Sequence, residues 1–338
     1  MASKNISILN AVGVNSLGGR NVLDIFKGFK PNKIYFNLKI KKFYFLYFYR
    51  MYLDFYFYFN IKSNETLLIY LSGMPPLIKS KAFTQCCFQN ANIFFKNCNL
   101  NFFSWLFSLD SIRFFFFKIF SNNVDQWIVF SQFSKKILID NNINDYKIKV
   151  VDIFSLDEQK IKFNNFKSSI LSQTNKKYNL IYPADNLNHK NHINVFNALI
   201  ILAKSNIYPR VLFTLDIKEK KNSRFLKLKK LYNLNVDFKI FKKKDMIHVY
   251  KNSEALIYPS LNETVGLPIH EALRYNLIII ASNLVYVRQF IKSNLLFDPL
   301  DPKDIARKIN FFLNKKNINF SLTKNKINFS IKEFKKIF

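Results

Sequence analysis

The stretch from Tyr258 to Ser282 reads YPSLNETVGLPIHEALRYNLIIIAS, and it combines the signals that decide the fold of this chain. The apolar run Ala255–Tyr258 predicts a short strand that ends at Pro259. A polar loop follows, and a Val-Gly-Leu-Pro sequence then opens a helix. The apolar run Leu277–Ala281 has the pattern of a strand that is buried on both faces. The stretch therefore predicts a strand, a loop, a helix and a second strand in an α/β protein.

This order of elements is typical of an anion site. The amides at the start of a helix have no intrahelical partner, and the helix dipole favours negative charge there. Gly266 lets the backbone approach a ligand closely, and Pro268 near the first helical position costs no hydrogen bond. The loop carries Glu263 and the helix carries Glu271, and carboxylates at such a site are suited to sugar hydroxyls. The alternative, which the spacing leaves open, is an ordinary helix with first-turn acids and a loop glutamate in solvent.

The segment from Glu263 to Ala272, ETVGLPIHEA, resembles the Glu-x7-Glu motif of the retaining glycosyltransferases of family 4, or group 1. Asn276-Leu277 replaces the Gly-x that is common in that family, and Val265 stands where Phe is frequent. The resemblance covers most of the chain and is strongest over residues 178–306. It implies an α/β protein of GT-B fold, with two Rossmann-like parallel-sheet domains facing a cleft and a C-terminal helix returning to the first domain. It also implies sugar transfer from a nucleotide-sugar with retention, without a metal or a cofactor.

The same resemblance implies roles for single residues. Glu271 accepts hydrogen bonds from the ribose hydroxyls and Glu263 from the donor sugar. Lys190 contacts the diphosphate, and it shares the catalytic role with Glu263. The donor-binding set is Gly18, Gly19, Lys190, Glu263, Thr264, Val265, Gly266, Leu267 and Glu271.

Lys190 follows the predicted strand Tyr178–Tyr182 and precedes a predicted helix from Ile193, which is a suitable place for a phosphate ligand. Its neighbours His189 and His192 are better suited to capping and loop roles than to metal binding, because a metal needs further ligands. The arginine that accompanies the lysine in the family has no match, and Asp185 or a neighbour takes its place.

The amino-terminal half predicts a second ligand loop. The strand-like run Ile6–Val14 leads to Gly18-Gly19 and then to a helical segment. The pattern is not the full dinucleotide fingerprint, and a plain glycine turn is the alternative. The resemblance implies that the two glycines close the site from the first domain. Gln89 and Asn90 stand where the family often has a histidine, and no histidine precedes His189.

Residues 33–62 are rich in aromatic side chains and begin with several lysines. We favour a buried strand followed by an amphipathic helix, and an anionic membrane surface is the alternative partner for these aromatics. The run Phe43–Phe59 is interrupted by Arg50 and Asp54, so it does not predict a membrane span.

The composition sets the remaining limits. The 338 residues suit two α/β domains: residues 1–160 for the acceptor, a linker at 161–177, residues 178–318 for the donor, and a C-terminal helix at 319–338. The net charge of +30 suggests an anionic partner, although compositional drift toward Lys, Asn, Ile, Phe and Tyr explains most of it. Three cysteines without a C-x-x-C pair favour a reduced cytoplasmic compartment, and the N-terminus lacks the pattern of a secretory signal.

The sequence thus predicts a retaining glycosyltransferase with a UDP-, GDP- or dTDP-sugar as donor. The acceptor is a glycan or a lipid-linked acceptor, and the pathway is cell-surface polysaccharide biosynthesis. We expect peripheral contact with an anionic membrane at the inner face of the plasma membrane, and no nucleic acid partner. Two alternatives stay open: a basic membrane- or polyanion-binding scaffold with a degenerate site, and a UDP-sugar epimerase of the same fold.

Overall fold

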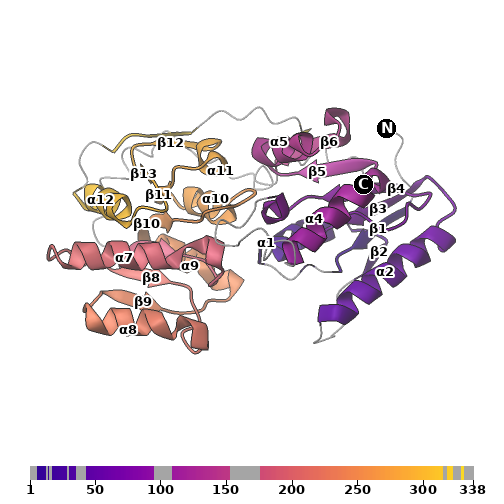
Figure 1. Cartoon of the computed structure of the whole chain (residues 1–338). Coiled ribbons are helices and arrows are strands. Elements are labelled where there is room, and N and C mark those ends of the chain that lie inside the picture. Colours follow the sequence, from indigo (N-terminus) through magenta and orange to yellow (C-terminus); the bar gives the residue numbers. More distant parts are fainter. Residues whose placement is uncertain are drawn as a thin grey trace. The chain divides into compact units, whose positions relative to one another are not determined.

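A computed structural model describes residues 6–12, 14, 17–28, 30–35, 43–94, 109–152, 176–314, 318–322 and 329–330. The contacts divide the chain into two units (Figure 1). Unit 1 consists of Met1–Glu158 and Lys326–Phe338, and unit 2 consists of Gln159–Asn325. Each unit contains its own parallel sheet, as expected for two Rossmann-like domains.

The sheet of unit 1 is parallel throughout and has the strand order β15-β6-β5-β4-β3-β1-β2. Its strands are β1 (Ile6–Asn10), β2 (Lys33–Tyr35), β3 (Thr66–Tyr70), β4 (Phe83–Cys87), β5 (Gln126–Val129), β6 (Ile148–Asp152) and β15 (Phe329–Ser330). The strands β3 and β5 are buried along their whole length and are mostly apolar after their first residues, Thr66 and Gln126.

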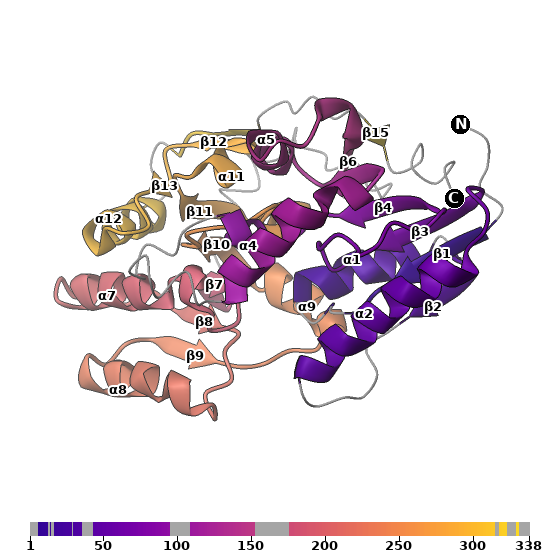
Figure 2. The same ribbon diagram turned by 45° about the vertical axis from the view of Figure 1, so that its right-hand side comes forward.

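The helices of unit 1 cover this sheet (Figure 2). They are α1 (Leu17–Lys27), α2 (Phe43–Asn60), α4 (Leu109–Phe120) and α5 (Gln132–Asp140), with short 3-10 turns at Ala91–Phe94, Ser121–Asn123 and Asp145–Lys147. The core is aromatic: Phe117 of α4 packs on Trp127 of β5 with ring centroids 5.0 Å apart, and Phe57 of α2 is buried in the same cluster. Ser131 caps α5 by accepting a hydrogen bond from the Ser134 amide.

The sheet of unit 2 is also parallel and has the order β13-β11-β10-β7-β8-β9. Its strands are β7 (Tyr178–Tyr182), β8 (Val211–Phe213), β9 (Val236–Phe238), β10 (Ser253–Tyr258), β11 (Ile278–Ser282) and β13 (Leu296–Phe297). A separate antiparallel pair joins β12 (Ile291–Ser293) to β14 (Phe320–Leu322). The central strands β10 and β11 are fully buried, as their apolar runs predict.

The helices of unit 2 connect these strands. They are α7 (His192–Ala203), α8 (Ser223–Leu231), α9 (Met246–Lys251), α10 (Leu267–Arg274), α11 (Val285–Arg288) and α12 (Pro302–Leu313), with 3-10 turns at Asn188–Lys190, Lys220–Asn222 and Lys243–Asp245. Asp301 caps α12 by accepting a hydrogen bond from the Lys303 amide.

The prediction of one C-terminal helix over residues 319–338 is wrong for the described part of that segment. Residues 320–322 form β14, which pairs with β12, and residues 329–330 form β15, which adds a parallel strand beside β6. Phe320-Ser-Leu alternates apolar and polar residues with the period of a strand and pairs with β12 alone, whereas β6 offers an open sheet edge to β15. The expected linker lies outside the described residues except at its last two positions.

Candidate functional site

The carboxyl ends of β7 and β10 bring two distant parts of the predicted site in unit 2 together. These strands are parallel neighbours, so the loops that follow them leave the same edge of the sheet. The loop after β7 carries Lys190 and the loop after β10 carries Glu263. The Lys190 Nζ atom and the Glu263 Oε1 atom form an ion pair, and the two side chains are only 15% and 16% exposed. The structure therefore places both predicted catalytic residues in one partly buried contact.

Backbone contacts fix the position of Lys190. The Tyr182 hydroxyl, at the end of β7, donates a hydrogen bond to the Lys190 carbonyl oxygen. The next residue, Asn191, has a left-handed backbone with φ of 56°, which Asn tolerates better than most residues. Its buried side-chain amide donates to the carbonyl oxygens of Pro259, at 3.2 Å, and Pro299, at 2.7 Å. This side chain thus joins the β7, β10 and β13 loops just before α7 begins.

A chain of hydroxyl groups fixes the position of Glu263. The Ser260 hydroxyl lies 2.8 Å from Glu263 Oε1 and donates to it. The Ser260 carbonyl oxygen accepts hydrogen bonds from the Ser282 hydroxyl at 2.9 Å and from the Tyr286 hydroxyl at 2.7 Å. The amide of the following residue, Leu261, donates to the His189 carbonyl at 2.7 Å. The loop that bears Glu263 is therefore anchored to β11, to α11 and to the Lys190 loop.

The electrostatic environment keeps Glu263 ionised. Burial by itself raises the pKa of the Glu263 carboxyl, but the Lys190 ammonium, with help from Ser260, outweighs it and lowers the pKa below 4.5. The buried phenols of Tyr182, Tyr258 and Tyr286 have pKa values well above 10, because they are desolvated and lie near this carboxylate. The site therefore consists of the Lys190 ammonium, the Glu263 carboxylate and a layer of three neutral tyrosine rings, the tyrosine floor, beneath them.

Gly266 precedes helix α10 in a left-handed conformation that favours glycine. It is the N-cap residue, with φ of 71° and ψ of 56°, and Pro268 follows in the first turn. A Cβ atom at this position would lie 3.2 Å from Ile269 Cδ1 and 3.6 Å from both the Tyr258 and the Tyr286 rings. The glycine thus lets the helix start pack directly on the tyrosine floor. The first turn of α10 carries no acidic residue, and Glu263 is mostly buried in its ion pair with Lys190. These two observations exclude the alternative of an ordinary helix with first-turn acids and a solvent-exposed loop glutamate.

Glu271, the second glutamate of the motif, lies one turn further along α10. Its Oε2 atom accepts a hydrogen bond from the Tyr250 hydroxyl of α9 at 2.7 Å. Burial raises the pKa of the Glu271 carboxyl above 4.5, although Tyr250, Arg274 and Lys243 act in the opposite direction. The two motif glutamates therefore have different partners and pKa shifts of opposite direction.

Two buried histidines near the site, His192 and His270, are poorly suited to proton transfer near neutral pH. His192 is buried beside the Tyr182 ring, with centroids 4.6 Å apart, and burial lowers its pKa to about 3. His270 packs edge-on against Phe290, and burial lowers its pKa to about 3 as well. No group of three or more His, Cys, Asp or Glu side chains in the described ranges is arranged to hold a metal ion.

The remaining predicted residues fall into two groups. Thr264, Val265 and Leu267 flank Gly266 between the Glu263 loop and α10, where the amides of a helix start are found. Gly18 and Gly19 belong to unit 1 and occupy the first turn of α1, although we predicted a loop at this place. Asp185, at the position where the family has an arginine, is exposed.

Sequence reasoning missed Ser260, Ser282, Tyr286 and Tyr250. Ser260 bonds to Glu263 from 3 residues away, and Tyr250 bonds to Glu271 from 21 residues away. Ser282 and Tyr286 bond to the Ser260 carbonyl from 22 and 26 residues away, so no local pattern marks them. The one available signal was the position of Ser260 and Ser282 directly after buried strands, where side chains meet at the carboxyl edge.

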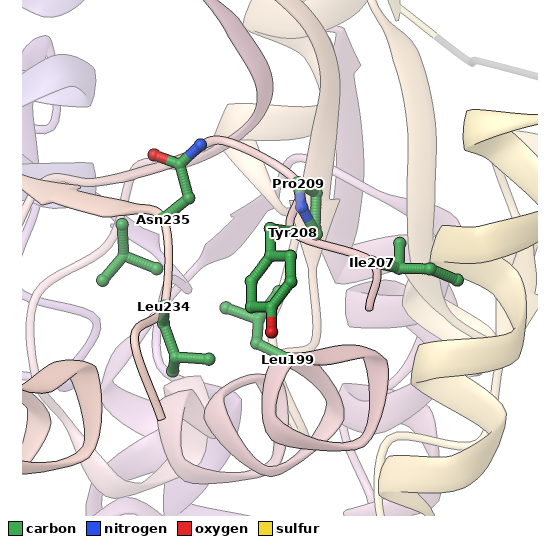
Figure 3. A pocket seen from close by; sticks show the side chains of 7 residues that line it. Leu199, Ile207, Tyr208, Pro209, Leu234 and Asn235 are labelled. Atoms are coloured by element: carbon green, nitrogen blue, oxygen red, sulfur yellow. The ribbon is translucent and has the colours of Figure 1, made fainter. Parts of the chain in front are cut away.

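A small pocket lies at the opposite edge of the same sheet (Figure 3). Ile207, Tyr208 and Pro209 precede β8, Leu234 and Asn235 precede β9, and Leu199 comes from α7. The figure shows the Tyr208 ring standing above α7 beside Leu199. These residues lie at the amino ends of the strands, so the pocket is separate from the Lys190–Glu263 contact.

Comparisons with known proteins find a matching family model, a curated relative and solved structures of the same fold. Residues 164–329 match the family model described as glycosyl transferases group 1. A curated relative, the capsular polysaccharide biosynthesis glycosyltransferase CapH of Staphylococcus aureus, is 29% identical over 193 residues, which are 54% of this chain and 54% of that protein. The chain thus aligns with about half the length of this relative.

Solved structures support the architecture. HepE from Anabaena in complex with UDP aligns with a TM-score of 0.61 at 12% identity, over 92% of this chain and 90% of that chain. A glycosyltransferase from Rickettsia africae aligns at 0.56 and 16% identity, over 91% and 88%. A TarM mutant of S. aureus in complex with UDP aligns at 0.57 and 16% identity, over 77% and 51%. At these identities the structures show the fold alone: the chain has the GT-B fold, and its residues 164–329 match the glycosyl transferases group 1 model.

Proposed function

We propose that this chain is a glycosyltransferase that moves a sugar from a nucleotide-sugar to a glycan or lipid-linked acceptor. The observation that carries the proposal is the Lys190–Glu263 ion pair at the carboxyl edge of the unit 2 sheet, beside the start of α10. This edge is where open α/β sheets bind ligands. A cation, a helix start and an anion in one place match the diphosphate and the hydroxyls of a nucleotide-sugar.

The diphosphate is the ligand for the positive elements. The Lys190 ammonium supplies a full charge, and the amides of Val265, Gly266 and Leu267 supply donors at the N-terminal end of the helix. Charge on the nucleoside diphosphate rises as the bond to the sugar breaks, so these groups stabilise the transition state more than the ground state. Lys190 can provide this stabilisation without any proton transfer.

The donor sugar and the ribose are the ligands for the two glutamates. When a diphosphate replaces Glu263 as the partner of the Lys190 ammonium, the ionised Glu263 carboxylate becomes available to accept hydrogen bonds from sugar hydroxyls. The Ser260 hydroxyl keeps that carboxylate in place during the exchange. Glu271 accepts from the ribose hydroxyls, and the Tyr250 hydroxyl orients it.

The finer assignments follow the family resemblance and the relatives. The Glu-x7-Glu motif favours family 4 and transfer with retention. HepE and the TarM mutant were both solved in complex with UDP, which favours a UDP-sugar over GDP- or dTDP-sugars. CapH, a capsular polysaccharide biosynthesis glycosyltransferase, favours a role in cell-surface polysaccharide biosynthesis. Such a role suits a cytoplasmic protein in peripheral contact with the inner face of the plasma membrane.

The test is release of nucleoside diphosphate from a panel of UDP-, GDP- and dTDP-sugars, with a lipid-linked acceptor. We expect turnover with one base, and a loss of at least about tenfold in Lys190→Ala. The control is Lys135→Ala, because Lys135 is also paired to a carboxylate and its side chain is 16% exposed, but it lies in unit 1 on α5. Turnover that survives Lys190→Ala and Glu271→Ala at the wild-type rate would contradict the site.

A further inference from the structure

Helix α2 of unit 1 has an unusual distribution of side chains. Along its outer side runs a stripe of large apolar residues at alternating spacings of three and four. The stripe residues are Phe45, Phe48, Tyr52, Phe55 and Phe59, which are 55%, 66%, 59%, 44% and 67% exposed. Tyr47, Met51 and Tyr58 widen the stripe and are exposed as well. Figures 1 and 2 both show α2 on the outside of unit 1.

The two charged residues of the helix point the other way. The Arg50 guanidinium donates to the Ser72 hydroxyl at 2.7 Å, to the Met74 carbonyl at 2.5 Å and to the Pro75 carbonyl at 2.9 Å. The buried Asp54 carboxylate accepts from the Tyr70 hydroxyl at 2.8 Å and from the Leu77 amide at 2.9 Å. The charged side chains of α2 therefore make hydrogen bonds inside the unit, and its aromatic rings are exposed to solvent. An ordinary surface helix has the opposite distribution.

An apolar face of this size indicates a missing contact. A helix that is apolar on all sides is normally buried, and contiguous exposed apolar patches mark interaction sites. The neighbouring helix α4 extends the exposed apolar surface with Ile112, Phe115 and Ile119, and Arg113 of α4 donates to the Tyr47 hydroxyl of α2 at 3.3 Å. Among the described residues, no helix is long and apolar enough to cross a membrane. A lipid contact would thus be made at a surface.

The sequence frames this helix with positive charge. Lys39, Lys41 and Lys42 directly precede α2, and Lys62 follows its last residue by two positions. The acidic residue between positions 25 and 64 is Asp54, which is buried. Aromatic rings between lysines match the boundary of an anionic bilayer, where rings enter the acyl region and ammonium groups meet the headgroups. The same lysines would repel a second copy of the helix.

We infer that α2 and the adjoining face of α4 form a docking surface for an anionic lipid bilayer, with α2 lying in the plane of the interface. The helix has 18 residues, so it offers a contact roughly 27 Å long at about 1.5 Å per residue. Arg50 and Asp54 join it to the loop that follows β3, at the carboxyl edge of the unit 1 sheet. If the proposed function holds, on which this step rests, the hydrogen bonds of Arg50 and Asp54 bring a candidate acceptor-binding edge close to lipid-linked acceptors in the bilayer.

The experiment is flotation of the full chain with vesicles of phosphatidylcholine alone or mixed with phosphatidylglycerol. The test variant is Phe48→Ser/Phe55→Ser/Phe59→Ser, which changes only exposed rings. The control is Leu231→Ser/Ile240→Ser, because these residues of unit 2 are 72% and 58% exposed and lie outside the proposed surface. We expect wild type and control to bind the anionic vesicles. The test variant should bind at least about tenfold more weakly, with an unchanged thermal midpoint.

Two results would overturn the inference. One is equal binding of test variant and wild type to the anionic vesicles. The other is a wild-type dimer that the triple substitution converts to a monomer, without vesicle binding by either, because a second copy would then cover α2. Binding that disappears with phosphatidylcholine alone or at high salt supports the anionic component. Flotation needs no donor, so vesicle binding by a chain that transfers no sugar would refute the proposed function and leave this surface intact.

Discussion

The Lys190 ammonium and the Glu263 carboxylate form an ion pair across 73 positions of the chain, and that contact joins the loops after β7 and β10. Both side chains are mostly buried, and each keeps further contacts that hold it in place. A pair with opposite charges at a ligand-binding edge is suited to exchange its partners when a ligand with both phosphates and hydroxyls arrives.

The Lys190–Glu263 ion pair makes the free energy of unfolding depend on pH. The pKa of Glu263 is lowered in the folded chain, so its contribution to stability is fully present above the unfolded value of about 4.5 and is lost as the pH falls through the folded pKa. Lys190→Met removes the main cause of this lowering. We expect the difference in unfolding free energy between wild type and Lys190→Met to shrink below about pH 4.5. Urea unfolding at several pH values measures it, and a difference that is constant with pH would contradict the ionised pair.

Tyr286→Phe removes one of the two donors to the Ser260 carbonyl. Because Ser282 keeps its hydrogen bond, we expect a loss of about 1 kcal/mol in stability and a lowered rate of turnover through a less rigid Glu263 loop. Tyr208→Phe is the control, since Tyr208 is 46% exposed and lies at the other edge of the sheet. Chemical denaturation and steady-state kinetics check both effects. Identical behaviour of the two variants would show that the Ser260 anchor is unimportant.

Gly266→Ala places a side chain where both the backbone conformation and the space oppose it. The residue has φ of 71°, and the new Cβ would lie 3.2 Å from Ile269. We expect a loss of about 1–3 kcal/mol and weaker donor binding. Asn206→Ala isolates the conformational cost, because Asn206 is an exposed residue with φ of 58°. The contact with Ile269 predicts that Gly266→Ala is the more destabilising of the two, and the reverse order in thermal unfolding would contradict this packing.

Tyr250→Phe leaves Glu271 without its hydrogen-bond donor. If Glu271 holds the ribose, the KM for the donor should rise by about tenfold or less while kcat changes little, because ribose binding is shared by ground and transition states. Glu271→Gln should raise KM in the same direction. A fall in kcat at unchanged KM, measured by initial rates over donor concentration, would place Glu271 in the chemical step instead.

The sequence predicted the elements around the site in unit 2 closely. Strong apolar runs and a Gly-Pro helix start define β10, α10 and β11, and their observed bounds differ from the predicted ones by few residues. Lys190 and Glu263 both appeared as site residues because each follows a buried strand. The contacts of Ser260 with Tyr286 and Ser282 could not be predicted, since they depend on which strands are neighbours. The helix expected at the C-terminus failed because pairing with β12 and β6 outweighed a weak helical pattern.

The aromatic segment shows a different limit. The sequence predicted a buried strand followed by an amphipathic helix over residues 33–62. The strand β2 is only partly buried, and α2 buries Leu53 and Phe57 but leaves a stripe of aromatic rings exposed. The inward direction of Arg50 and Asp54 was not predictable, because their partners lie in the loop after β3 and not in the helix itself. Because apolar residues occur on all sides of α2, its pattern has no single hydrophobic stripe that identifies the buried side.

The most direct test of the site is the affinity for UDP, measured by isothermal titration calorimetry for the wild type, Lys190→Met and Lys135→Met. The site predicts that the wild type and Lys135→Met bind UDP equally well and that Lys190→Met binds at least about tenfold more weakly, because one ammonium contact with the diphosphate is lost. Equal affinity of all three proteins for UDP would contradict the placement of the diphosphate at Lys190.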